Sequence, residues 1–330
     1  MQKLLVTQCE RQEREMQMRD DLGITTKLEN GKAYLEFALP EKIGRLLSAL
    51  QIEIWEGAEG ERLVFHGEYS SEEADSMTAL LLRPHLWDGM RDPYVYLVKA
   101  QGRFRSVEYG EKMGGMEKEE KLDPAEDITG EVEMYWRQEL TIYDVRVVEK
   151  KGILLNEKEF LPHEVVYRLP PQISDAGTRV EQVRRDLERL VQMGVNVIRL
   201  EGTGTGAEGV NCSEVRTFYS LCRKRGFLTG DLWIRPENLP VYRGLPGETT
   251  CQALLAADGR TLTERYYYYQ AKWSSEPVLY PVLSTLHRQE NGLLSLTIYS
   301  NQKKVVLYVD GVLFLFQSAA SGDPEFIFED

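Results

Sequence analysis

The sequence predicts a multidomain α+β chain in which two strand-rich segments flank a shorter β-α-β-α-β segment. Its 330 residues exceed the usual size of one domain. Apolar side chains alternate with a period of two in both outer segments, whereas those between positions 180 and 222 recur largely at helical spacing. We predict a polar N-terminal segment at 1–21 and domains at 22–149, 150–245 and 246–330.

The segment 22–149 is predicted to form an immunoglobulin-like β-sandwich. Its clearest strands carry apolar residues at every second position, as half-buried strands do. These residues are Ala33, Leu35, Phe37, Leu39, Leu50, Ile52 and Ile54. Further strands are expected at 62–66, 77–82, 94–100 and 131–148. Short strands at this spacing, separated by turn residues, are typical of such a sandwich.

The segment 150–245 changes to alternating strands and helices. Gly194 and Gly226 are expected to end the two helices, because glycine readily adopts the left-handed conformation of a helix C-terminus. Ser213 is the expected N-cap of the second helix. The predicted order is a strand at 160–167, a helix at 180–193, a strand at 195–200, a helix at 213–225 and a strand at 227–234.

The segment 246–330 is predicted to be a C-terminal β-sandwich that follows a proline-bearing linker at 235–240. Asp310-Gly311 is a strong signal for a two-residue hairpin turn. The expected strands are 266–273, 278–286, 293–300, 304–309 and 312–317.

Charge and cysteine usage exclude several classes of function. The net charge of -13 disfavours binding to nucleic acid or to anionic membrane surfaces. The first residues carry only a short apolar run before charges follow, so we expect neither a signal peptide nor a membrane span, and a cytoplasmic protein. Cysteines without CxxC pairs predict free thiols rather than a zinc site or a disulfide framework. They are Cys9, Cys212, Cys222 and Cys251. We expect no metal and no cofactor.

Four stretches, in the same order along the chain, resemble family 2 glycoside hydrolases of the β-galactosidase and β-glucuronidase kind. They are 83–96, with Leu86-Trp87 and Pro93-Tyr94-Val95-Tyr96; 143–156, ending in Leu154-Leu155-Asn156; 193–199, with Met193-Gly194-Val195-Asn196 before Arg199, followed by Phe218-Tyr219-Ser220-Leu221-Cys222; and 267–274, with Tyr299-Ser300-Asn301 and Val309-Asp310-Gly311. The resemblance implies that the middle segment is a partial (β/α) barrel fragment of three parallel strands.

The same resemblance implies that the catalytic glutamates are missing. The family places them at the ends of its fourth and seventh barrel strands. A complete barrel takes about 250 residues, and the stretch between Ile234 and Tyr266 is too short for the remaining units. After Arg199 the chain continues with Leu200-Glu201 in place of the family's histidine-bearing segment. The resemblance therefore favours a non-catalytic protein of carbohydrate metabolism, one that binds sugar or assists a full-length hydrolase.

The candidate carbohydrate-binding residues are Arg199, Glu201, Asp231 and Trp233. Arg199 matches an arginine of the family's substrate pocket, or else it pairs with Glu201 or Asp231 as a structural ion pair. Trp233 is placed to stack on a sugar or to cover a sheet edge.

Two alternatives remain open. In the first, the chain is an active β-glycosidase with Glu201 and Asp231 as its carboxylate pair, because retaining enzymes need two carboxyl groups about 5 Å apart and adjacent strands lie about 4.8 Å apart. In the second, it is a purely structural interaction protein.

Self-association is also expected. Three parallel strands cannot close a barrel, so they leave an apolar face and an edge that some other surface has to cover. We expect a homo-oligomer, or packing of this fragment against the chain's own sandwiches. The apolar residues concerned are Val195, Val197, Ile198, Phe227 and Leu228.

Overall fold

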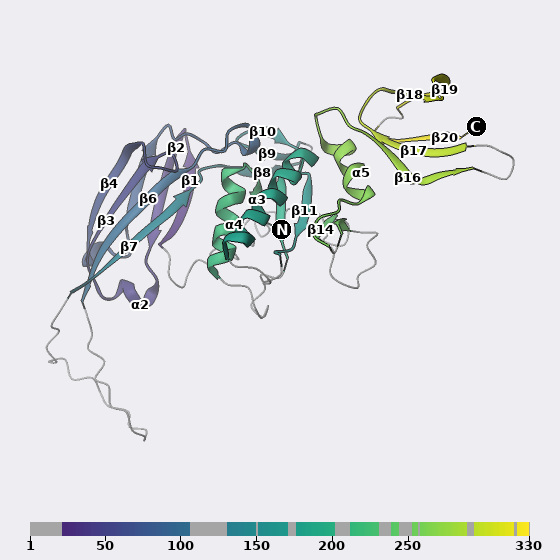
Figure 1. The fold of residues 1–330 in the computed structure, drawn as a ribbon. Coiled ribbons are helices and arrows are strands. Elements are labelled where there is room, and N and C mark those ends of the chain that lie inside the picture. The colour runs from purple at the N-terminus through teal and green to yellow at the C-terminus, as the bar shows by residue number, and fades with distance from the viewer. Residues whose placement is uncertain are drawn as a thin grey trace, which may run out of the picture. The chain divides into compact units, whose positions relative to one another are not determined.

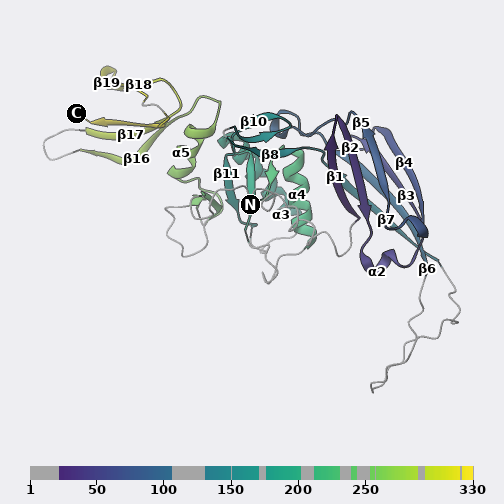
Figure 2. The same cartoon turned by 180° about the vertical axis from the view of Figure 1, so that it is seen from behind.

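The computed structural model shows six β-sheets and three longer helices in the part of the chain that it describes (Figure 1 and, from behind, Figure 2). These residues fall into two compact units. One is built from residues 22–88 and 92–159, and the other from residues 160–329 together with the short turn Gly89–Arg91. The described residues are 22–105, 131–149, 151–170, 176–201, 212–230, 239–243, 253–256, 258–288, 294–319 and 322–329.

The first unit contains a seven-stranded antiparallel β-sandwich. One sheet has the order β1-β2-β5 and the other the order β4-β3-β6-β7. The strands are β1 (Gly23–Glu29), β2 (Lys32–Ala38), β3 (Leu47–Glu56), β4 (Arg62–Ser70), β5 (Thr78–Leu82), β6 (Tyr96–Arg105) and β7 (Glu131–Leu140), with short helical turns α2 (Glu41–Gly44), η1 (Ser71–Glu73) and η2 (Gly89–Arg91). The side chains of Ala33, Leu35 and Phe37 point into one core, which confirms the predicted alternation.

A small sheet of β8 (Val145–Val148), β9 (Gly152–Leu155) and β10 (Lys158–Phe160) completes the first unit. The strand predicted at 131–148 is therefore two strands, separated at 141–144. Asn156, in a left-handed conformation, holds the break: its Oδ1 accepts from the amide of Asp144 at 3.0 Å and its Nδ2 donates to the carbonyl of Trp87 at 2.9 Å. One asparagine side chain thus ties the hairpin to the preceding loop.

The second unit is built on a parallel sheet of five strands, where the sequence predicted three. Their order is β13-β12-β11-β14-β15, and all the pairings are parallel. The two strands that were missed have only three residues each, too short for a period-2 pattern to show. The strands are β11 (Glu164–Tyr167), β12 (Val197–Leu200), β13 (Leu228–Thr229), β14 (Val241–Arg243) and β15 (Ala253–Leu255).

Helices α3 (Ala176–Met193) and α4 (Cys212–Lys224) cover one face of this sheet, and their predicted periodicity is confirmed. A glycine with positive φ follows the last residue of each helix within two positions, Gly194 at 88° after α3 and Gly226 at 82° after α4. A Cβ on Gly194 would lie 2.4 Å from the carbonyl oxygen of Trp273, so close packing also requires glycine there. Helix α4 begins at Cys212, so Ser213 lies inside its first turn and the predicted N-cap is wrong. No helix in the described ranges is both long and apolar enough to cross a membrane.

Residues 266–273, predicted as a strand, belong to helix α5 (Glu264–Trp273). Aromatic residues favour strands, but packing against neighbours overrides that preference. The Tyr266 hydroxyl donates to the carbonyl of Arg189 on α3 at 2.8 Å, while the ring of Tyr267 stacks on Tyr280 with centroids 3.8 Å apart. Consecutive tyrosines thus meet different neighbours, which a helix allows because its side chains radiate in several directions.

The C-terminal strands form a second small sandwich. A three-stranded sheet of β16 (Leu279–Arg288), β17 (Leu294–Ser300) and β20 (Glu325–Glu329) packs against the hairpin of β18 (Lys304–Val309) and β19 (Val312–Ser318). Asp310 and Gly311 both have positive φ, 51° and 79°, as a type I′ turn requires, which confirms the predicted hairpin. The core between the layers contains Ile298, Val305, Phe326 and Phe328.

The imidazole of His163 is held at the amino edge of the parallel sheet. Its Nδ1 lies 2.8 Å from the carbonyl oxygen of Gly194, and its ring stacks on Trp273 with centroids 5.2 Å apart. Burial lowers the pKa of His163, and the hydrogen bond with Gly194 offsets that effect only in part. The folded protein therefore favours the neutral imidazole.

The stability of the fold is expected to decrease as pH falls through the titration range of histidine. The folded-state pKa of His163 lies below the unfolded value of about 6.5. The unfolded chain therefore binds the proton first, and this stabilisation is lost from about pH 6.5 downward until the pH passes the folded-state pKa. Urea titrations at several pH values between about pH 8 and 5 measure the free energy of unfolding. Its decrease toward low pH should be smaller for His163→Gln than for His287→Gln, which replaces an exposed histidine. Equal pH dependence in both variants would contradict this role of His163.

Candidate functional site

Arg168 and Glu201 meet at the carboxyl edge of the parallel sheet, one residue beyond the ends of β11 and β12. The Nε of Arg168 donates to one carboxylate oxygen of Glu201, and its Nη2 lies 3.3 Å from the other. Its Nη1 donates to the carbonyl of Arg243, at the end of β14, over 3.2 Å. The guanidinium of Arg168 therefore connects the ends of three strands. The charge-assisted fork with Glu201 joins β11 to β12, and the hydrogen bond to Arg243 joins β11 to β14.

Arg199 takes a partner that the sequence analysis did not consider. Its Nε and Nη2 each lie 2.9 Å from Oε1 of Glu164, the first residue of β11. Of the two partners that the sequence predicted, Glu201 pairs with Arg168, and Asp231 lies outside the described residues. The parallel register sets Arg199 opposite Val166, so Glu164 falls on the same face of the sheet. Glu164 is only 1% exposed, and a buried ion pair of this kind is costly to break because the remaining charge loses its partner.

Of the other three predicted site residues, the structure describes only Glu201. The side chain of Glu201 is 47% exposed at the carboxyl edge, within reach of a solute. Asp231 and Trp233 lie outside the described residues. The carboxylate pair of Glu201 and Asp231 therefore stays a hypothesis.

Asp186 of α3 is a buried carboxylate that the sequence analysis missed. It is 1% exposed and accepts hydrogen bonds from Tyr167 on β11 at 2.9 Å and from Tyr242 on β14 at 3.1 Å. The Nη2 of Arg243 lies 2.6 Å from the same carboxylate. A signal was present: Asp186 follows Val183 by three residues and so interrupts the apolar face of the helix.

The electrostatics around Asp186 keep both tyrosines protonated. Burial raises the pKa of Tyr167 well above its ordinary value, and the neighbouring Asp186 raises it further. The pKa of Tyr242 is raised by the same two causes in the same order. The hydroxyl groups therefore act as hydrogen-bond donors to a carboxylate that Arg243 neutralises, an arrangement suited to holding elements together rather than to proton transfer.

In the described part of the chain, no three His, Cys, Asp or Glu side chains lie close enough together to hold a metal ion.

Cys222 of α4 is a buried free thiol, as the sequence analysis expected. Burial raises its pKa far above the ordinary value, so this thiol stays protonated and unreactive.

Comparison with known proteins gives a likeness in fold. No protein-family model and no curated protein sequence matches this chain. An FMN-binding β-glucuronidase from Facaelibacterium prausnitzii L2-6 matches with a TM-score of 0.62 and 12% identity, over 94% of this chain and 70% of its own. A β-glycosidase from Bacteroides vulgatus matches with a TM-score of 0.60 and 12% identity, over 94% of this chain and 61% of its own. The β-glucuronidase of Parabacteroides merdae matches with a TM-score of 0.55 and 12% identity, over 93% of this chain and 59% of its own.

These likenesses place the chain among proteins with the fold of β-glucuronidases and related β-glycosidases. At 12% identity they show the fold alone, and they do not assign a family. The chain spans about three fifths of two of these enzymes. Activity and ligand have to be argued from the site itself.

Replacing Asp186 should strongly destabilise the protein. Asp186→Asn keeps the size of the side chain but leaves the guanidinium of Arg243 buried without a counter-charge, and we expect a loss of about 3 kcal/mol in the free energy of unfolding. Glu188→Gln is the matched control on the same helix, since its side chain is 54% exposed and pairs with Arg225 on the surface. That change should stay within about 0.5 kcal/mol. Urea unfolding measures both, and equal effects of the two changes would refute a structural role for Asp186.

Proposed function

We propose that this protein binds carbohydrate without hydrolysing it, as a reduced relative of family 2 glycoside hydrolases or as an accessory to a full-length hydrolase. The observation that carries this proposal is the likeness in fold to three β-glycosidases over at least 93% of the chain. The Leu-Trp, Leu-Asn and Met-Gly-Val-Asn motifs of the sequence support the same kinship independently.

The carboxyl edge of the parallel sheet is the proposed binding site. Open α/β sheets bind their ligands outside the carboxyl ends of the strands, at the point where the strand order reverses. That point lies between β11 and β14, where the guanidinium of Arg168 reaches the backbone of Arg243 and the half-exposed carboxylate of Glu201. Carboxylate oxygens accept hydrogen bonds from sugar hydroxyl groups.

The remaining candidates complete this proposed site. Asp231 follows the described end of β13 closely and would supply a second acceptor, and Trp233 would supply a ring for stacking against the sugar. Arg199, tied to Glu164, would orient the site from within the sheet. Hydrolysis is not proposed, because the chain between β13 and α5 is too short for the barrel units that carry the family's glutamates.

Sugar binding without turnover is the expected result. On an array of β-linked glucosides, galactosides and glucuronosides the protein should bind at least one class. Glu201→Gln should weaken that binding by about tenfold, since a hydrogen bond to a charged group is lost. Glu72→Gln, an exposed glutamate of the first unit, is the matched control and should leave binding unchanged. Nitrophenol release from the corresponding aryl β-glycosides should stay at the buffer rate.

The active-glycosidase alternative makes the opposite prediction in the same assays. Turnover that follows the purified protein and is abolished by both Glu201→Gln and Asp231→Asn would establish a rebuilt carboxylate pair and overturn the non-catalytic proposal. Any ligand that binds only the native state must stabilise that state. If no sugar binds and none raises the melting temperature, the result would therefore support the alternative that this is a purely structural interaction protein.

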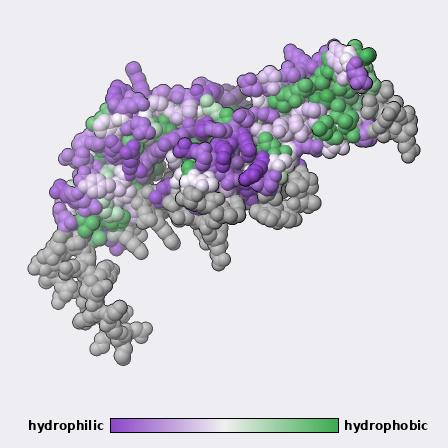
Figure 3. Space-filling view, in the orientation of Figure 1, coloured by the Kyte–Doolittle hydropathy of each residue, from purple (hydrophilic) through white to green (hydrophobic). Residues whose placement is uncertain are grey.

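We also propose that the protein self-associates through its C-terminal strands. Hydrophobic side chains gather on these strands in Figure 3. The exposed apolar residues include Leu279, Leu283, Tyr308, Val312 and Phe316. Every copy presents the same surface, so two copies can cover it symmetrically without a second protein.

Light scattering at micromolar concentration should therefore give a multiple of the chain mass of 38.0 kDa. Tyr308→Asp should shift the mass toward the monomer, because it places a charge within the apolar surface. Tyr135→Asp is the matched control in the first unit, with a tyrosine that is 67% exposed against 61% for Tyr308. A monomeric wild-type protein, or dissociation by both variants alike, would contradict association through these strands.

A further inference from the structure

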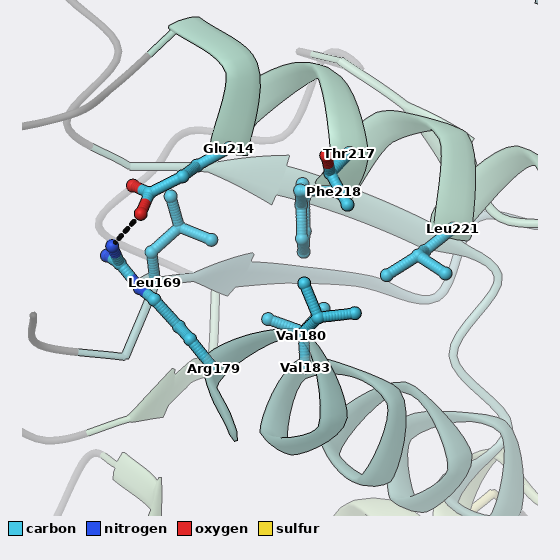
Figure 4. Close-up of a pocket in the computed structure, with 8 residues that line it drawn as sticks. All are labelled: Leu169, Arg179, Val180, Val183, Glu214, Thr217, Phe218 and Leu221. Carbon is cyan, nitrogen blue, oxygen red and sulfur yellow. Dashed lines mark hydrogen bonds and ion pairs between the residues drawn. The ribbon is translucent and has the colours of Figure 1, made fainter. Parts of the chain in front are cut away.

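A cavity of 130 Å³ lies between α3 and α4, on the helix-covered side of the parallel sheet (Figure 4). Thr217 of α4 borders it and is exposed, so the cavity reaches the surface and a solute can enter. An apolar cavity of about 150 Å³ is large enough to bind benzene. The space between these helices therefore has about the size of one six-membered ring. Its apolar walls are Leu169, Val180, Val183, Phe218 and Leu221.

Three stacked aromatic rings lie beside this cavity. Tyr242 of β14 stacks on Tyr167 of β11 with centroids 5.5 Å apart and planes inclined by 17°. Tyr167 in turn stacks on Phe218 of α4, at 4.9 Å and 23°. Phe218 is the ring of the three that lines the cavity, and its side chain is 1% exposed and thus fixed in place. Aromatic pairs gain more than their buried area alone supplies, so a ring inside the cavity would be favoured by its contact with Phe218.

The polar end of the cavity carries two charges that offset each other. Figure 4 shows the guanidinium of Arg179 and the carboxylate of Glu214 facing each other there, with Nη1 donating to Oε1 over 2.6 Å. Arg179 is only 8% exposed. A ligand that brought a further charge into the cavity would lose its hydration without meeting a counter-charge that is not already paired. The cavity therefore favours uncharged ligands.

We propose that this cavity binds a small uncharged aromatic compound of about benzene size. The apolar walls supply the affinity, and the ring of Phe218 supplies the preference for an aromatic over an aliphatic ligand. The pair of Arg179 and Glu214 selects against charged analogues of the same shape. Neither Arg168 nor Glu201 lines the cavity, so this inference does not depend on the proposed carbohydrate site.

Fluorine NMR of the full chain with fluorobenzene tests the proposal. Fluorobenzene should bind saturably, and benzene should displace it. Cyclohexane has a similar size but no aromatic electrons, so it should bind about threefold to tenfold more weakly than benzene. Benzoate should bind at least about tenfold more weakly, because its charge has to be buried. Val180→Phe, which fills the cavity from α3, should abolish binding, whereas Glu188→Gln, on the exposed side of the same helix, should leave it unchanged.

Two further variants keep the test decisive if Val180→Phe fails to fold. Phe218→Leu removes the aromatic wall and should remove the preference for benzene over cyclohexane. Leu221→Ala enlarges the cavity, so naphthalene should bind at least about tenfold more tightly to this variant than to the wild-type protein.

Several outcomes would overturn the proposal. They are an absence of fluorobenzene binding, displacement by cyclohexane or benzoate as strong as by benzene, and a preference for benzene that survives Phe218→Leu. Undiminished binding to a folded Val180→Phe variant, or no gain for naphthalene in a folded Leu221→Ala variant, would place the ring outside this cavity and would overturn the proposal as well.

Discussion

The carboxylate of Asp186 joins α3 to the central strand of the parallel sheet, β11, and to its neighbour β14, and the arrangement of the second unit depends on it. Its oxygens accept from Tyr167 of β11, and from Tyr242 and Arg243 of β14. Removing a carboxylate from water costs several kcal/mol unless hydrogen bonds and an opposite charge offset that cost. Here both are present only when the helix and both strands occupy their observed positions. The buried acid therefore specifies how these elements come together, as well as stabilising them.

The position of β14 beside β11 decides where a ligand site can form. In a fragment of consecutive barrel strands, the fourth strand would lie next to the third, here β13. Instead, β14 lies next to the first strand, β11, on the side that the last strand occupies in a closed barrel. The resulting order is also that of open doubly wound sheets, whose ligands bind where the order reverses. At that point the backbone of β14 receives a hydrogen bond from Arg168, and Glu201 is held in place by the same guanidinium. The amino edge of the sheet, by contrast, is occupied by the stack of His163 on Trp273.

Helix α5 connects the parallel sheet to the C-terminal strands within the second unit. Tyr266 bonds to the backbone of α3, while Tyr267 and Tyr268 contact rings on β16 and β17. Aromatic rings bury a large area with few rotatable bonds, so a single helical turn of tyrosines can fix the contact on both sides. The run of tyrosines is thus a packing device that joins two layers of this unit.

By itself the sequence determined the elements whose signals are local. Alternation around Leu35 and helical periodicity around Leu187 predicted β2 and α3, because burial on one side imposes a period on neighbouring residues. The Asp310-Gly311 turn was readable because few residues adopt its backbone conformation. Only the tertiary structure decided that the tyrosine run is helical, that two three-residue strands extend the parallel sheet, and that Arg199 pairs with Glu164. Each of these depends on contacts between segments distant in sequence, where register and packing outweigh the propensity of a short stretch of chain.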